Sequence, residues 1–243
     1  MDPFIPILQG SVARFSTALR TGPLDAPVRG CPGWDLDALA RHLGFVHRWA
    51  TLAAATSAMP DPAAIDELPA GAPADELVAW FDAGAAALVD TFASLDPDGP
   101  TWHPFPVPML GKVWPRRQAH EAYVHVWDAE DAIGELGSFD AHVCADGIAE
   151  YFEVIVPRII TRDQRPAPVG VLAVRCTDTP FADGSERLVV RCDSPLDVRL
   201  DPTAEATAEL AAPAEQLWLA LWGRHSLDVD DSLGAAWLAY GGN

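Results

Sequence analysis

The 243-residue sequence predicts an α+β protein in which a four-helix bundle precedes a small C-terminal α+β domain. In the first part of the chain, apolar residues recur at three- and four-residue spacing between proline-rich loops, which is typical of amphipathic helices. Beyond about residue 165, short β-branched stretches alternate with turn residues and predict strands. We therefore expect a helical bundle over 1–165 and an α+β domain over 166–243.

Composition limits the possible partners of the protein. Hydrophobic residues make up 49% of the chain and charged residues 21%, so a packed core is expected. The net charge is −19, from 35 acidic and 16 basic residues. Such a surface repels nucleic acid and anionic membranes, so neither is an expected partner, and an anion site would need a local cluster of arginines. No apolar run reaches the length of a membrane span.

The four cysteines are widely spaced and form no CxxC pair; they are Cys31, Cys144, Cys176 and Cys192. The N-terminus does not resemble a signal peptide, so we expect reduced thiols in a cytoplasmic protein. A structural zinc site built from thiolates is not expected. The protein is expected to be a monomer or a weak homodimer.

Two helices are predicted before the proline-rich connection at 60–73. The first covers 6–21, and the second runs from an N-cap at Asp35 to about residue 58. On the second helix, His42 shares a face with apolar residues and is predicted to point with the core, whereas His47 lies about 140° away. A lone histidine on an apolar face is more often a hydrogen-bonded core residue than a metal ligand.

A third helix is predicted from Pro73 to Leu95, before a loop at 96–113 that is rich in proline and is expected to line a pocket. Its apolar residues form one stripe that should face the core. This stripe consists of Leu77, Trp80, Phe81, Leu88 and Phe92.

The fourth predicted helix carries the most distinctive chemistry. It starts near Pro115 and contains no glycine or further proline until Gly134. Glu121 and His125 are four residues apart and therefore lie one above the other, as half of a metal site or as part of a solvated helix face. His120 and His125 are five apart, about 140° around the helix, so the zinc-protease motif is excluded and His120 is not an expected ligand.

The remaining sequence predicts one long helix, a sheet and two short helices. The long helix covers about 140–162, and Pro157 is expected to kink it. Strands are predicted at 169–175, 187–191, 196–200 and 206–210, with a hairpin turn at 183–184, and the short helices at 213–222 and 234–240.

Several motifs together resemble the mycothiol-dependent maleylpyruvate isomerase family. They are CPGWD at 31–35, LARHLG at 39–44, RRQAHE at 116–121, HVWD at 125–128 and WGR at 222–224. The resemblance covers nearly the whole chain. It implies a DinB-like four-helix bundle and a C-terminal domain similar to sterol carrier proteins.

The resemblance also implies a divalent metal, usually zinc, bound by His42, Glu121 and His125. Three protein ligands with an open position are typical of a catalytic zinc site. The implied cofactors are this metal and mycothiol, whose metal-bound thiolate would attack a small electrophilic substrate. The implied reactions are cis–trans isomerisation, as from maleylpyruvate to fumarylpyruvate, or S-transfer; the sequence does not identify the substrate.

Two arginines are candidates for catalysis and for binding of the thiol. Arg117, one turn before Glu121, could bind a carboxylate of the thiol or substrate, or pair with a nearby acid. Arg224 could reach the thiol, or form a salt bridge between the domains. Asp128 could orient a metal-bound histidine or belong to a polar network. Tyr123 and His47 are expected to be structural.

Two other functions remain open from the sequence. The chain could be a non-catalytic module that binds a metal or small ligand, or a DinB-like hydrolase that uses zinc-bound water. Thiol dependence of any turnover would separate these possibilities from the mycothiol-dependent enzyme.

Overall fold

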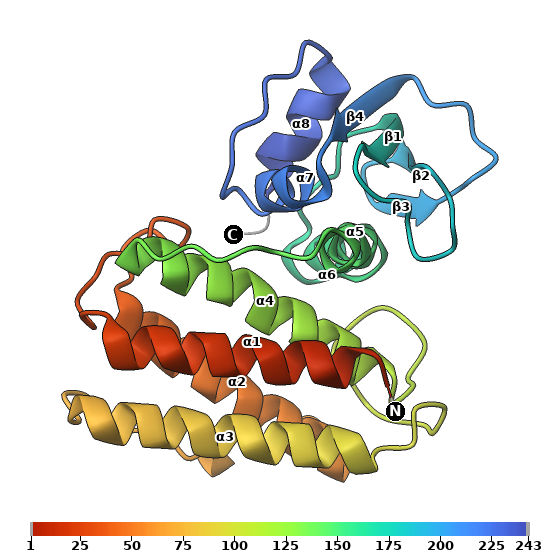
Figure 1. Ribbon diagram of the computed structural model, residues 1–243. Helices are drawn as coiled ribbons and strands as arrows, with labels where there is room; N and C mark the ends of the chain where they lie inside the picture. The colour runs from red at the N-terminus through yellow and green to blue at the C-terminus, as the bar shows by residue number, and fades with distance from the viewer. Residues whose placement is uncertain (1, 242–243) are drawn as a thin grey trace. The chain divides into compact units, whose positions relative to one another are not determined.

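The computed structural model describes residues 2–241 and confirms the α+β class, with a helical bundle and a four-stranded sheet flanked by helices (Figure 1). It divides into two compact units. The first contains the residues up to Pro104 together with Pro108–Gly137; the second contains Phe105–Val107 and the chain from Ser138 onward.

The first unit is a four-helix bundle. Helix α1 packs against α3 and α4, and α2 packs against the same two helices, which closes the ring. The helices are α1 (Phe4–Thr21), α2 (Leu36–Thr56), α3 (Ala74–Ser94) and α4 (Val113–Ile133), with a short 3-10 turn η1 at Pro62–Ala64.

Helix boundaries agree closely with the sequence signals. The Asp35 side chain caps α2 by accepting a hydrogen bond from the Ala38 amide (2.8 Å). The predicted apolar stripe of α3 is buried in full. Gly134 ends α4 in the left-handed conformation at φ 73°, which glycine adopts without a steric penalty.

The buried face of α2 differs from the prediction. His47 is fully buried and packs against the Phe81 ring, with a centroid distance of 5.4 Å, whereas His42 is only partly buried. His42 does point inward, toward α4, but His47 is the fully buried histidine, which the periodicity did not predict. Helices α2 and α3 approach closely at a small residue: the backbone of Gly44 on α2 lies directly against the Trp80 ring on α3. A pattern of large apolar residues does not reveal such a face.

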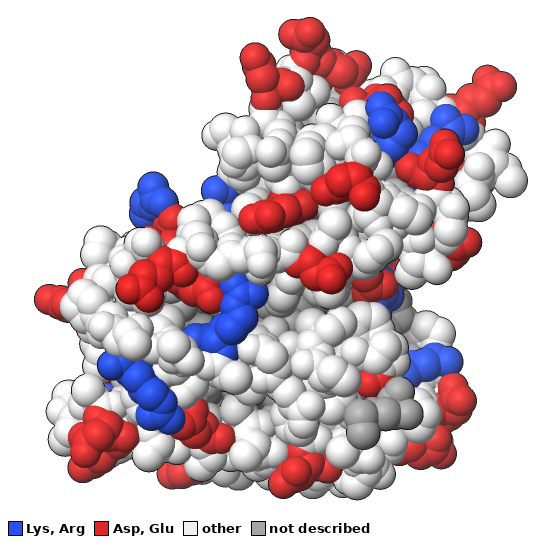
Figure 2. Space-filling view, viewed as in Figure 1, with Lys and Arg blue, Asp and Glu red and all other residues white. Residues whose placement is uncertain are grey.

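Helix α3 has the composition of a possible membrane span. Within the described residues it is the one helix that is long and apolar enough, yet its buried side chains pack against α1 and α2 in the bundle. A core helix of a soluble bundle has the same composition. Figure 2 shows acidic side chains spread over the face in view, with basic side chains in smaller patches among them.

The second unit contains a four-stranded sheet of order β3-β2-β1-β4. Strands β1 (Gly170–Cys176), β2 (Leu188–Ser194) and β3 (Asp197–Leu200) pair antiparallel, and β4 (Ala208–Ala212) pairs parallel with β1. The turn before β2 has Gly184 at φ 82°. Helices α7 (Ala214–Leu221) and α8 (Ser232–Tyr240) complete the sheet domain.

The predicted 140–162 helix is interrupted rather than simply kinked. It consists of α5 (Ala141–Glu150), a π-helical turn η2 (Tyr151–Ile155) and α6 (Val156–Asp163). Pro157 lies in the first turn of α6, and because it has no N–H, the carbonyl one turn earlier loses its usual partner. A π-helical turn is a common way to absorb this loss.

These helices belong to the second unit. Helix α5 packs against α7, and the π-helical turn packs against β3. The observed division therefore lies at Gly137–Ser138 and not near residue 165, where the sequence changes from helix to strand character. Packing, and not the change in secondary structure, defines the boundary.

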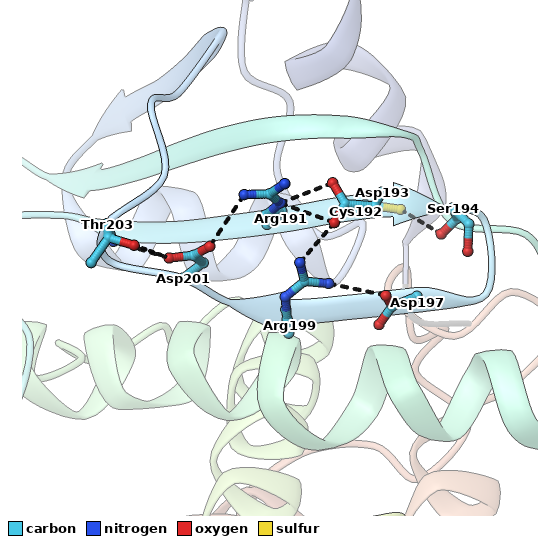
Figure 3. Close-up of polar contacts among 8 residues, drawn as sticks. All are labelled: Arg191, Cys192, Asp193, Ser194, Asp197, Arg199, Asp201 and Thr203. Carbon is cyan, nitrogen blue, oxygen red and sulfur yellow. Dashed lines mark hydrogen bonds and ion pairs between the residues drawn. The ribbon is translucent and has the colours of Figure 1, made fainter.

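The outer strand β3 carries charged pairs with β2 (Figure 3). Arg199 on β3 binds Asp193 on β2 (2.7 Å), and Arg191 binds both Asp193 (2.8 Å) and Asp201 (3.4 Å). Exposed pairs of this kind contribute little stability. Their charge does, however, discourage a further strand from adding to this edge of the sheet.

The Gly44–Trp80 contact gives a test of the bundle packing. A Cβ at position 44 would lie 2.1 Å from a ring atom of Trp80. Gly44→Ala should therefore lower the free energy of unfolding by about 1–3 kcal/mol. In the matched control Gly10→Ala, on α1, an added Cβ meets no atom within 4 Å. That change should stabilise the protein by about 0.5–1 kcal/mol. Denaturant unfolding monitored by circular dichroism measures both; equal effects would contradict the packing.

Candidate metal centre

Three potential ligands meet between α2 and α4. His42 projects from α2, and Glu121 and His125 project from successive turns of α4. Glu121 Oε1 lies 3.5 Å from His42 Nε2 and 3.6 Å from His125 Nε2. The structure thus brings together the three predicted ligands, including the one from a different helix.

These separations fit a single tetrahedral cation. Ligand atoms at about 2.0–2.1 Å from zinc in a tetrahedron are about 3.3–3.4 Å from one another. The two measured distances are within a few tenths of an ångström of this value. Two imidazole nitrogens and one carboxylate oxygen are also a common donor set for catalytic zinc, so the residues present fit a divalent cation.

Arg117 orients the carboxylate of Glu121. Its guanidinium Nη2 donates to Glu121 Oε2 (2.7 Å), which leaves Oε1 directed toward the histidines. Burial alone would raise the pKa of Glu121, but the contacts with His125 and His42 and the charge of Arg117 hold this pKa well below its usual range. Glu121 is therefore ionised, as a metal ligand must be. Of the two roles predicted for Arg117, the structure contains the pairing with a nearby acid; direct contact with thiol or substrate stays a prediction.

Asp128 orients His125. The imidazole Nδ1 donates to Asp128 Oδ2 (2.9 Å), and Nε2 faces Glu121 Oε1 (3.6 Å). Burial lowers the pKa of His125, but the hydrogen bonds with Asp128, Cys31 and Glu121 outweigh it and raise this pKa well above 6.5. A carboxylate behind a metal-binding histidine is the common arrangement in zinc proteins.

Aromatic rings fix the orientation of His42. The Trp34 ring lies 4.9 Å from the His42 ring, and the rings of His42 and His125 meet edge to face at 5.3 Å. Trp34 and Cys31 belong to the CPGWD motif. The sequence identified this motif as a family signature, but gave no sign that its side chains reach α2 and α4.

Other candidates lie outside the cluster. His120 is buried and packs edge to face on Phe4 at 5.7 Å, in agreement with its exclusion as a ligand. Tyr123 is also buried. Arg224 is in the second unit, where its guanidinium donates to the Trp222 carbonyl (2.6 Å), and its role in thiol binding stays a prediction.

Comparison with known families agrees with the motifs. Residues 8–130 match the model of the mycothiol maleylpyruvate isomerase N-terminal domain. The chain belongs to this family. No curated protein and no solved structure matches it. The family match contains His42, Glu121 and His125 and ends before Ser138, so the predicted likeness of the C-terminal domain to sterol carrier proteins is not tested. The family name indicates a mycothiol-dependent isomerase or a related enzyme.

One prediction for the metal centre distinguishes His125 as a ligand from His120 as a non-ligand. His125→Ala should lower bound zinc at least about ten-fold, because it removes a ligand, whereas His120→Ala should retain zinc at the wild-type ratio. Glu121→Ala should behave like His125→Ala. The zinc-to-protein ratio is measured by mass spectrometry after dialysis, on material whose helicity has been checked. Equal zinc loss in His120→Ala and His125→Ala would contradict the assignment.

A second prediction concerns pH. In the metal-free protein His125 holds its proton above pH 6.5 because its pKa is raised, and a cation must displace that proton. Zinc affinity should therefore fall about ten-fold per pH unit below the raised pKa. Competition with a chromophoric chelator across pH measures it.

The matched variant is Asp128→Asn, which removes the hydrogen-bonding carboxylate. It should weaken zinc binding about 10–100-fold at high pH and move the pH-dependent region lower. Glu130→Gln, on the same helix but paired with Arg14, should leave both properties unchanged. An identical pH profile in Asp128→Asn and wild type would show that Asp128 does not control His125.

Proposed function

We propose that this protein is a zinc-dependent enzyme that uses mycothiol as a thiolate nucleophile toward a small electrophile. The reaction class is cis–trans isomerisation of the maleylpyruvate type or S-transfer. Support comes from the family membership and from one observation: the Nε2 atoms of His42 and His125 converge on Glu121 Oε1 at 3.5 and 3.6 Å.

The donor set determines the charge of the proposed centre. Two neutral imidazoles and one carboxylate around a divalent cation leave a net charge of +1, which favours an anionic fourth ligand. A cation bound there would lower the pKa of a thiol at the open position well below its free value of about 8.5 and so supply a thiolate at neutral pH.

Arg117 and Asp128 act in this proposal as positioning residues. Both are almost completely buried, and each engages the ligand atom that faces away from the cation: Glu121 Oε2 and His125 Nδ1 respectively. They therefore fix the direction of the remaining donor atoms before any cation binds. Preorganisation of this kind is what a catalytic site requires of the residues behind its ligands.

Substrate and thiol would enter at the exposed side of the cluster. His42 and Glu121 are partly buried, with side-chain exposures of 34% and 21%, whereas the His125 side chain has 9%. We propose that Arg224 contributes a cationic contact to mycothiol during this reaction. In this role it would affect thiol affinity and not the coordination of the cation.

The test uses cobalt in place of zinc, because cobalt–thiolate coordination gives strong near-ultraviolet charge-transfer absorption that cobalt–water coordination lacks. Adding mycothiol to the cobalt form should produce this absorption. Arg224→Ala should require more mycothiol to reach the same maximum, since it changes thiol affinity only.

The outcomes separate the three functions considered for this chain. Mycothiol-dependent absorption together with thiol-dependent turnover of an activated alkene or other electrophile supports the enzyme. Absorption without turnover of any electrophile would indicate a non-catalytic binding module. No absorption at any mycothiol concentration would overturn the thiol chemistry and favour hydrolysis by zinc-bound water.

A further inference from the structure

A second group of potential ligands lies on the other side of the His125 ring. Cys31 Sγ donates to Asp128 Oδ2 (3.7 Å), which also accepts the hydrogen bond from His125 Nδ1 (2.9 Å). One ligand atom each from Cys31, His125 and Asp128 lies within 4.8 Å of the others. This group shares His125 with the first cluster but uses the opposite ring nitrogen.

The loop that carries Cys31 is held firmly against α4. Within it, the Val28 amide donates to the Trp34 carbonyl (2.9 Å), and the Trp34 amide donates to the Cys31 carbonyl (3.0 Å). Gly33 adopts φ 87°, a conformation that favours glycine. At the base of the loop, Arg29 forms an ion pair with Asp131, one turn beyond Asp128. Cys31 is therefore fixed in place beside Asp128.

The distances in this second group also fit a tetrahedral cation. A sulfur at about 2.3 Å and an oxygen at about 2.0 Å from one ion are about 3.5 Å apart, close to the measured 3.7 Å. The 2.9 Å between His125 Nδ1 and Asp128 Oδ2 would lengthen by about 0.4 Å. Cys31 is partly exposed, so a cation can reach the group from solvent.

We propose that Cys31 Sγ, His125 Nδ1 and Asp128 Oδ2 form a second cation site that takes a soft, thiophilic ion. Thiolate is the donor that such ions prefer, and the first cluster contains none. A neutral imidazole has one unprotonated nitrogen, so His125 can serve Nε2 or Nδ1 but not both. Binding releases the Cys31 thiol proton and the His125 Nδ1 proton to solvent and leaves Nε2 protonated, so the two sites exclude each other. A thiophilic ion would thereby withdraw His125 from the proposed catalytic centre.

Cadmium is the probe, because cadmium–thiolate coordination absorbs in the ultraviolet. Metal-free protein is titrated with cadmium chloride in the absence of any added thiol. Wild type should show a charge-transfer band that saturates at one equivalent. His42→Ala, which lacks one ligand of the first cluster, should keep the band, and Cys31→Ser should lose it. Cys192→Ser is the matched control: this buried cysteine of the second unit should not affect the band.

Two results would overturn the proposal. The first is absence of the band from folded wild type, and the second is its persistence in Cys31→Ser. Zinc added first should raise the cadmium concentration needed for the band, and a band at full strength with zinc still bound at one equivalent would refute mutual exclusion.

The proposal is independent of the proposed enzyme and can fail separately from it. Cys31→Ser should still bind zinc through His42, Glu121 and His125. The cobalt and mycothiol titration is best performed in this variant, because its charge-transfer absorption then reports the added thiol and not Cys31. A negative cadmium result with a positive mycothiol result would refute only the second site.

Discussion

The ion pair between Arg117 and Glu121 is the constraint on which the candidate site depends. Arg117 is 3% exposed, and a charge so deeply buried is costly unless it is paired. Its guanidinium pairs with Glu121, four residues further along the same helix. The pairing directs the other carboxylate oxygen toward α2, where His42 meets it. Replacing Glu121 would remove a carboxylate that balances the buried Arg117 charge, so the bundle and the site are coupled through this pair.

Sequence reasoning was most successful where chemistry depends on local spacing. The Glu121–His125 pair, the exclusion of His120 and the Asp35 cap all follow from helical geometry over a single turn or two. His42 was different. Its place in the cluster came from the family resemblance, while the periodicity of α2 predicted its inward direction but not the full burial of His47. The close approach of α2 to α3 at Gly44 determines the real buried face, and no local pattern contains this contact.

The same difference between local patterns and long-range contacts decides which features of the second unit the sequence predicts. The strands were predicted within a few residues because alternation of apolar and polar side chains is a local property. The parallel pairing of β4 with β1 joins residues far apart in sequence, as in Leu172 with Ala208, and was not predicted. The division at Gly137–Ser138 was also missed, because it depends on α5 packing against α7.

The CPGWD loop shows what a family motif can leave undescribed. The family match includes this loop, yet the physical role of the loop appears only when it is folded. Trp34 then lies against His42, and Cys31 against Asp128, so one short loop contacts the residues on both sides of the cluster. Asp128 therefore accepts hydrogen bonds from both Cys31 and His125, and its position controls which nitrogen of His125 carries the proton. Cys31 contacts both Asp128 and His125, so the loop reaches the ligand cluster at His125 and at the carboxylate that orients it.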